Sequence, residues 1–222
     1  MRSAEFVTSA AGASGFPSDG LPEIALVGRS NVGKSSLINA LTAQRIARTS
    51  AAPGKTRLAN IYRVTRGSAG LLYLVDLPGY GYAGGGREAA REFDELTRAY
   101  FQRGREGHAQ VAALLLIDAR HPGLENDQAA WKWLRQTVAE SAIVATKIDK
   151  LARGQRIRAL RELESVVEDS VTPCSAVTGE GLDDLWNLIE RLANSRNLQP
   201  RRSRNNSSRL PPKATAARPP TK

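Results

Sequence analysis

The sequence predicts an α/β fold: a three-layer sandwich with helices on both faces of a mostly parallel sheet and one antiparallel hairpin at its edge. Short apolar runs typical of buried strands alternate with segments whose apolar residues recur at helical spacing. Two runs, 58–65 and 70–76, are separated only by a short turn, which indicates the hairpin. The 222 residues suffice for one core with tails. We expect an N-terminal segment at 1–22 that can add an edge strand, a globular domain at 23–195 and a disordered basic tail at 196–222.

The elements of the domain follow in a regular order. A strand at 23–27 leads through a glycine-containing loop to a helix from Lys34 to about Ala43. The hairpin comes next, followed by a helix that carries Phe93, Leu96 and Tyr100. The expected remainder is a strand at 111–117, a helix at 125–138, a strand at 142–145, a helix with Ile157, Leu160, Leu163 and Val167, a strand at 171–174, and a helix with Leu182, Leu185, Trp186, Ile189 and Leu192. We interpret these apolar stripes as core, because their period alone explains them.

The net charge of +10 is concentrated at the C-terminus. Residues 196–222 hold eight basic and no acidic residues, five prolines and only two leucines, too few apolar groups to fold alone. Such a tail favours the phosphates of nucleic acid over a membrane, with a passive solubilising tail as the alternative. Cys174 is the only cysteine, which excludes an internal disulfide. No run reaches transmembrane length and no secretory signal is present at Met1–Glu5, so a cytoplasmic protein is expected.

One loop matches a phosphate-binding pattern. Residues 28–35 fit G-x-x-x-x-G-K-[ST], directly after the 23–27 strand and at the start of a helix. Backbone N–H groups of such a loop surround phosphates, Lys34 neutralises β/γ oxygens and the Ser35 hydroxyl can ligate Mg²⁺. The sandwich is therefore expected to be of the P-loop NTPase type.

Two further segments can complete the phosphate and metal site. Asp76 ends a strand and is followed by Leu77, Pro78 and Gly79, giving D-x-x-G, whose carboxylate reaches Mg²⁺ through water and whose glycine N–H can bond a γ-phosphate. Thr56 stands just before the hairpin and can offer Mg²⁺ a second hydroxyl. Ser35, Thr56 and, through water, Asp76 are the expected metal-binding residues.

A third segment indicates which base is bound. Thr146-Lys147-Ile148-Asp149 follows the strand that ends at Ala145. An ionised Asp149 only accepts hydrogen bonds, so it fits the N1–H and N2 donors of guanine and is left unpaired on adenine, which argues against an ATPase or kinase. Ser175-Ala176-Val177, after the last strand, can supply an N–H to the guanine O6.

The series GRSNVGKSS, PGKT, DLPGYGYA, TKID and SA resembles the EngB (YihA/YsxC) GTPases of the TRAFAC class over about residues 4–193. The resemblance implies a monomeric Mg²⁺-dependent GTPase that assists assembly of the large ribosomal subunit and that is needed for normal division septum formation. The basic tail lies outside the resemblance; its charge favours rRNA as the nucleic acid that it would contact. A nucleotide-gated interaction module of the division machinery with little dependence on hydrolysis is the alternative. The nucleotide-binding residues carried over by this match are Gly28, Arg29, Ser30, Asn31, Val32, Gly33, Lys34, Ser35, Gly54, Lys55, Thr56, Arg57, Leu58, Asp76, Leu77, Pro78, Gly79, Thr146, Lys147, Ile148, Asp149, Ser175, Ala176 and Val177.

The expected catalytic residues are Lys34, Thr56, Gly79 and Asn31. Tyr80 stands where many GTPases have a water-orienting Gln, so hydrolysis is expected to be slow unless activated. In related GTPases an Asn at the position of Asn31 helps hold a K⁺ ion; alternatively, Asn31 tolerates an awkward backbone angle. Arg120 and His121 can be a partner contact or a loop anchor.

Overall fold

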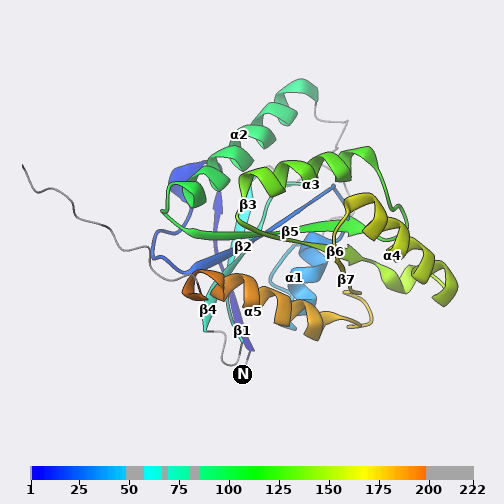
Figure 1. Cartoon of the computed structure of the whole chain (residues 1–222). Coiled ribbons are helices and arrows are strands. Elements are labelled where there is room, and N and C mark those ends of the chain that lie inside the picture. The colour runs from blue at the N-terminus through cyan, green and yellow to red at the C-terminus, as the bar shows by residue number, and fades with distance from the viewer. Residues whose placement is uncertain (1, 49–57, 67–69, 81–85, 199–222) are drawn as a thin grey trace, which may run out of the picture.

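The computed structural model describes residues 2–48, 58–66, 70–80 and 86–198, with the backbone alone at 2, 66, 86–94 and 196–198. Within these residues a seven-stranded sheet forms the middle layer, in the order β1-β3-β4-β2-β5-β6-β7 (Figure 1). The strands are β1 (Arg2–Ala10), β2 (Pro22–Gly28), β3 (Ala59–Arg66), β4 (Leu71–Asp76), β5 (Gln110–Asp118), β6 (Glu140–Thr146) and β7 (Val171–Pro173). The helices are α1 (Lys34–Thr42), α2 (Gly86–Arg105), α3 (Glu125–Thr137), α4 (Arg153–Val167) and α5 (Leu182–Leu198).

The sheet is parallel except at one side. β2 pairs in parallel with β4 and β5, and β5-β6-β7 continue in parallel. β3 is antiparallel to β4, which confirms the predicted hairpin, and β1 adds a second antiparallel partner outside β3. The α/β sandwich class predicted from the sequence is thus confirmed, with β1 as the edge strand.

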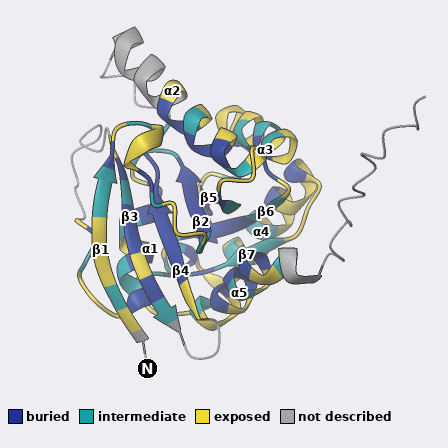
Figure 2. Cartoon of the chain, turned by 90° about the vertical axis from the view of Figure 1, so that its left-hand side faces the viewer, coloured by how far each residue is buried: buried dark blue, intermediate teal, exposed yellow. Residues whose placement is uncertain are grey.

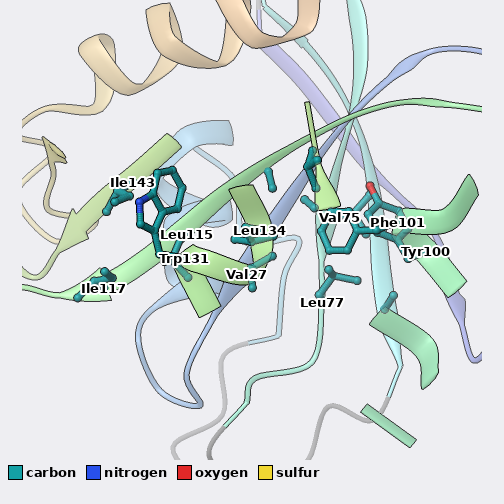
Figure 3. Packing of buried hydrophobic residues seen from close by; sticks show 14 of the residues in the cluster. Val27, Val75, Leu77, Tyr100, Phe101, Leu115, Ile117, Trp131, Leu134 and Ile143 are labelled. Atoms are coloured by element: carbon teal, nitrogen blue, oxygen red, sulfur yellow. The ribbon is translucent and has the colours of Figure 1, made fainter. Parts of the chain in front are cut away.

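Two apolar clusters hold the layers together. One lies between the sheet and α2, α3 and α4, where Tyr100, Phe101, Trp131 and Leu134 meet Val27, Val75 and Leu115 (Figure 3). The other lies between the opposite face and α1 and α5, with Leu37, Ile38, Trp186 and Ile189. Strands buried on both faces read as continuous apolar runs, which explains the 23–27 and 111–117 segments. The central strands are accordingly buried, whereas β1 carries exposed residues (Figure 2).

One core assignment is wrong. Ile157 of α4 is 45% exposed, although its spacing matched the stripe of Leu163 and Val167, which are buried. α4 covers the end of the sheet, where β7 has three residues, and buries a narrower stripe than a central helix.

A buried ion pair ties α2 to β2. The Arg103 guanidinium lies 3.2 Å from the Glu23 carboxylate, donates to the Pro17 carbonyl at 2.5 Å and lies 4.9 Å from the centre of the Phe16 ring. Glu23 is 2% exposed, and burial raises its pKa against the opposing effect of Arg103. This pair fixes the amino end of the strand that feeds the phosphate-binding loop.

The topology determines where polar side chains gather. Because β2, β4, β5, β6 and β7 are parallel, their carboxyl ends share one edge of the sheet. In open α/β sheets ligands bind at this edge.

Candidate functional site

The loop between β2 and α1 has the backbone that a phosphate-binding loop requires. Gly33 (φ 112°) and Asn31 (φ 64°) adopt left-handed conformations. A Cβ on Gly28 would lie 2.8 Å from the Leu116 carbonyl oxygen, so only glycine fits between the loop and β5. The helix N-terminus at Lys34 directs its free N–H groups toward this loop, which favours an anion.

Lys34 lies folded over the loop. Its Nζ donates to the Gly28 carbonyl at 3.3 Å, and the residue is 9% exposed. Burial lowers the pKa of the ammonium, and Asp76 opposes that effect. Within the described part of the chain the Lys34 ammonium has a single hydrogen-bond partner, the Gly28 carbonyl, so it can turn to a phosphate oxygen without losing a stronger hydrogen bond.

Ser35 and Asp76 form a pair of hard oxygen ligands. The Ser35 hydroxyl donates to Asp76 Oδ2 at 2.7 Å. Asp76 is 2% exposed, and its Oδ1 is buried with no hydrogen-bond partner among the described residues. Burial raises the pKa of Asp76, opposed by Lys34 and Ser35. A hydroxyl and an orphaned carboxylate oxygen suit Mg²⁺, which prefers oxygen and retains waters, so this pair fits the cation.

The D-x-x-G segment lies directly on the phosphate-binding loop. Ser30 N–H donates to the Tyr80 carbonyl at 3.1 Å, and Arg29 and Tyr80 form an isolated parallel bridge. A Cβ on Gly79 would lie 2.6 Å from Ser30 N, so the glycine is required for this approach. The two segments are therefore in direct backbone contact in this conformation.

A buried carboxylate on α3 holds both segments. The Tyr80 hydroxyl donates to Asp127 Oδ1 at 2.8 Å, and Arg29 Nε lies 3.4 Å from the same oxygen. Asp127 is 1% exposed, and burial raises its pKa despite the contacts with Tyr80 and Arg29. Asp127 was not singled out from the sequence. An acidic residue is common in the first turn of a helix, where the helix dipole stabilises its charge, so its presence there does not indicate a functional contact.

Hydrogen bonds join the residues after β6 to the loop after β7, where the base acceptor is expected. Ser175 Oγ donates to Asp149 Oδ1 at 2.7 Å and accepts the N–H groups of Val177 and Thr178, each at 3.1 Å. The hydrogen bond from Ser175 lowers the pKa of Asp149, so its carboxylate is ionised at neutral pH. Ser175 N–H is bonded to the Glu180 carbonyl, so Ala176 supplies the one N–H of 175–177 that has no partner among the described residues.

The base site and the phosphate loop are joined directly. Thr146 Oγ1 donates to the Val32 carbonyl at 2.8 Å, and Lys147 Nζ donates to the Asn31 carbonyl at 2.6 Å and to Asp118 Oδ2 at 2.9 Å. Arg120 binds the same Asp118 carboxylate through Nε and Nη2. Arg120 is therefore an anchor of its loop in this conformation.

Comparison with known proteins agrees with this geometry. The family model described as 50S ribosome-binding GTPase matches residues 23–147. The probable GTP-binding protein EngB of Heliobacterium modesticaldum is 38% identical over 210 residues, covering 92% of this chain and 98% of that protein. The EngB of Chlorobaculum parvum is 42% identical over 195 residues, covering 86% and 96%. The chain belongs to the EngB family of GTP-binding proteins.

Solved structures agree on the fold. A probable EngB protein superimposes with a TM-score of 0.60 at 21% identity, covering 78% of this chain and 99% of that one. Era of Aquifex aeolicus bound to GDP·AlF₄⁻ superimposes with a TM-score of 0.65 at 23% identity, covering 77% of this chain and 56% of that one. At these identities the likeness concerns the P-loop GTPase fold alone.

The structure brings together most of the EngB residues expected at the site. The loop 28–35, the segment 76–79 and the residues 146–149 and 175–177 meet at one edge of the sheet. Gly54, Lys55, Thr56 and Arg57 lie outside the described residues, as does the tail from 199 onward; Leu58 is described and is 40% exposed.

Two other features of the EngB chain bear on the sequence expectations. Cys174 is buried, and burial raises the pKa of its thiol to about 12. Among the described helices, none is both long and apolar enough to cross a membrane.

Proposed function

We propose that this chain is a GTP-binding and hydrolysing switch that assists assembly of the large ribosomal subunit and is needed for normal division septum formation. The main support for a nucleotide-dependent switch is one hydrogen bond: Ser30 N–H of the phosphate loop donates to the Tyr80 carbonyl at 3.1 Å. A γ-phosphate competes for N–H groups of that loop, so GTP and GDP should leave the 76–80 segment in different positions.

Each part of the site has a role in this cycle. Lys34 turns from the Gly28 carbonyl to the β/γ oxygens, and Gly79 N–H bonds the γ-phosphate. Ser35 and Thr56 would supply hydroxyl ligands to Mg²⁺, and Asp76 would hold the ion through water; when bound, Mg²⁺ would neutralise phosphate charge. We also propose a monomeric state, which the family resemblance implies, and a cytoplasmic location, as expected in the sequence analysis.

Hydrolysis without an activator should be slow. Tyr80 stands at the sequence position of the water-orienting Gln of many GTPases, but its hydroxyl donates to Asp127. We expect about 10⁻³ turnovers per second or fewer, as in small GTPases that lack their activator. An isolated-protein rate near 1 per second would contradict this assignment.

Guanine selection rests on Asp149, for which the Asp149→Asn variant is a direct test. An amide offers a donor where guanine needs an acceptor, so affinity for GDP should fall about a hundredfold or more. Xanthine carries a carbonyl at C2, so the same variant should gain affinity for xanthosine diphosphate. Loss of both nucleotides, with an unchanged melting temperature of the nucleotide-free protein, would contradict the acceptor role.

A K⁺ ion held by Asn31 is proposed as the missing positive charge in hydrolysis. Asn31 has φ 64°, which favours asparagine for the backbone alone, so the two explanations need a variant that separates them. Asn31→Gly keeps the backbone angle and removes the side chain. If K⁺ binds, KCl accelerates the original protein over NaCl and not the variant; equal rates in both salts would exclude the ion.

The ribosomal partner is supported by the family model, whose description names the 50S subunit. Era, a neighbour in fold, has been solved with nucleotides 1506–1542 of 16S rRNA. The test is co-sedimentation with large subunits in GTP, a non-hydrolysable analogue or GDP. Association in GTP and the analogue but not GDP supports the switch; equal association in all three contradicts it.

The basic tail is proposed as an rRNA contact. Because α5 continues to Leu198, the deletion should remove 199–222 and leave the helix intact. We expect weaker association with large subunits and a flatter dependence on salt, since fewer counterions are released. Unchanged binding would leave the tail a passive solubiliser.

A further inference from the structure

Asp118, the last residue of β5, is surrounded by donors. It is 4% exposed. Its Oδ1 accepts Arg120 N–H at 3.1 Å and Arg120 Nε at 2.9 Å. Its Oδ2 accepts Arg120 Nη2 at 2.7 Å and Lys147 Nζ at 2.9 Å. The contacts from Arg120 are local to the loop, whereas Lys147 comes from the end of the neighbouring strand β6.

Lys147 is held in one place by three features. Its backbone is left-handed (φ 60°), which turns the side chain back toward the phosphate loop. Its Nζ bridges Asp118 Oδ2 and the Asn31 carbonyl, at 2.9 and 2.6 Å. Its Cε lies 3.9 Å from the position of a Cβ built on Gly33, so the aliphatic stem crosses the loop. That stem lies in the loop that presents Asp149, the base acceptor.

We infer that Asp118 is a positioning residue for guanine-nucleotide binding, acting by fixing the ammonium of Lys147 between β5 and the phosphate loop. This inference rests on the proposed function, because it assigns Asp118 to the same nucleotide site.

The electrostatics explain why the carboxylate is needed. The Arg120 guanidinium and the Lys147 ammonium share one oxygen of Asp118, so removing its charge leaves two cations facing each other. Lys147, 27% exposed, can reach water, and its stem then leaves the loop. Burial alone would raise the pKa of Asp118, but the hydrogen bonds from Arg120 and Lys147 hold it well below the ordinary value, so the carboxylate is charged at neutral pH.

A purely local role is the competing explanation. If Asp118 only anchors its loop through Arg120, the loss of Arg120 should reproduce the loss of Asp118. If it acts through Lys147, the two side chains should be coupled in nucleotide affinity and Arg120 should matter little. A double-mutant cycle separates these cases.

The experiment measures GDP dissociation constants of the full chain and of Asp118→Asn, Lys147→Met, their double variant and Arg120→Ala. Glu5→Gln is the matched control, because it also converts an ion-paired carboxylate to an amide, with Arg63, at the far edge of the sheet. We expect Asp118→Asn to weaken GDP binding about tenfold, a usual effect of losing a hydrogen bond between charged groups. Lys147→Met should weaken it at least as much, the double variant no further, and the Arg120 and Glu5 variants less than threefold.

Other outcomes are equally decisive. Additive effects of the Asp118 and Lys147 variants, or an Arg120→Ala effect as large as that of Asp118→Asn, would overturn the inference. If Asp118→Asn proves unfolded, the Lys147→Met variant, at a partly exposed position, still tests the inference, because unchanged GDP affinity there removes the route through Lys147. A full chain that does not bind GDP would instead refute the proposed function.

Discussion

Removing the Tyr80 hydroxyl tests the contact between the D-x-x-G segment and α3. In Tyr80→Phe, Asp127 Oδ1 loses its 2.8 Å donor, while Oδ2 is already without a partner in the described part of the chain. A hydrogen bond to a charged group contributes about 1.5–3 kcal/mol, and Arg29 remains 3.4 Å away to compensate in part. We expect the free energy of unfolding of the nucleotide-free protein to fall by about 2 kcal/mol.

The chain offers a matched control in Tyr73→Phe. Tyr73 also donates its hydroxyl to a carboxylate, Asp19 Oδ2, at 2.7 Å, but Asp19 is exposed and lies away from the site. Water replaces that bond, so the control should lose less than about 1 kcal/mol. Urea unfolding of both variants gives the comparison. Equal losses of unfolding free energy in the two variants would refute the claim that the Tyr80 hydroxyl stabilises the buried Asp127 carboxylate.

The pH dependence of the Tyr80→Phe loss follows from Asp127. Burial raises the pKa of this carboxyl in the folded protein above its unfolded value, and the Tyr80 hydroxyl partly offsets the rise. The variant therefore raises it further. A raised folded pKa stabilises the fold at low pH and loses that contribution as pH rises through it. The loss should be largest near neutral pH and shrink toward pH 4; a loss that grows on acidification would contradict this sign.

Three further predictions concern other parts of the molecule. Gly79→Ala brings a Cβ to 2.6 Å from Ser30 N, so thermal unfolding should show a loss of about 1–3 kcal/mol, and an unchanged midpoint would mean that the segment can move freely. Arg103→Met leaves Glu23 buried and unpaired and should cost about 3–5 kcal/mol in urea unfolding, most of it regained when Glu23→Gln is added; no recovery would mean that packing, not charge, dominates. The pKa of Asp118 is lowered in the folded protein, so the ionised carboxylate should stabilise the fold by a constant amount above about pH 5 and lose that effect on further acidification. The difference in unfolding free energy between the original protein and Asp118→Asn should therefore narrow below about pH 5 and not at neutral pH.

The fold was predictable because its signals are local. The run at 111–117 is apolar throughout, as a strand covered on both faces requires, and it became β5. The turn at 66–69 predicted the hairpin of β3 and β4. The assignment of Ile157 to the core was wrong because the helical period of apolar residues does not show how wide a face a helix at the end of the sheet buries.

The candidate site could be proposed from the sequence where a motif carries its own chemistry. Lys34, Ser35, Asp76 and Asp149 follow from residue types at fixed spacing. Asp127 and the Asp118–Lys147 contact depend on the packing of distant segments, which no spacing encodes. Likewise, the sequence could not show that Ser175 uses its hydroxyl on Asp149 and on two backbone N–H groups, which leaves Ala176 as the available donor.

That saturation of Ser175 has a kinetic consequence. Hydrogen bonds within the protein hold Asp149 and Ser175 at the proposed base site. GDP and GTP carry the same base, so we expect them to enter at similar rates. The protein then has to distinguish GTP from GDP after entry, at the phosphate end of the nucleotide, where Ser30 N–H is bonded to the Tyr80 carbonyl.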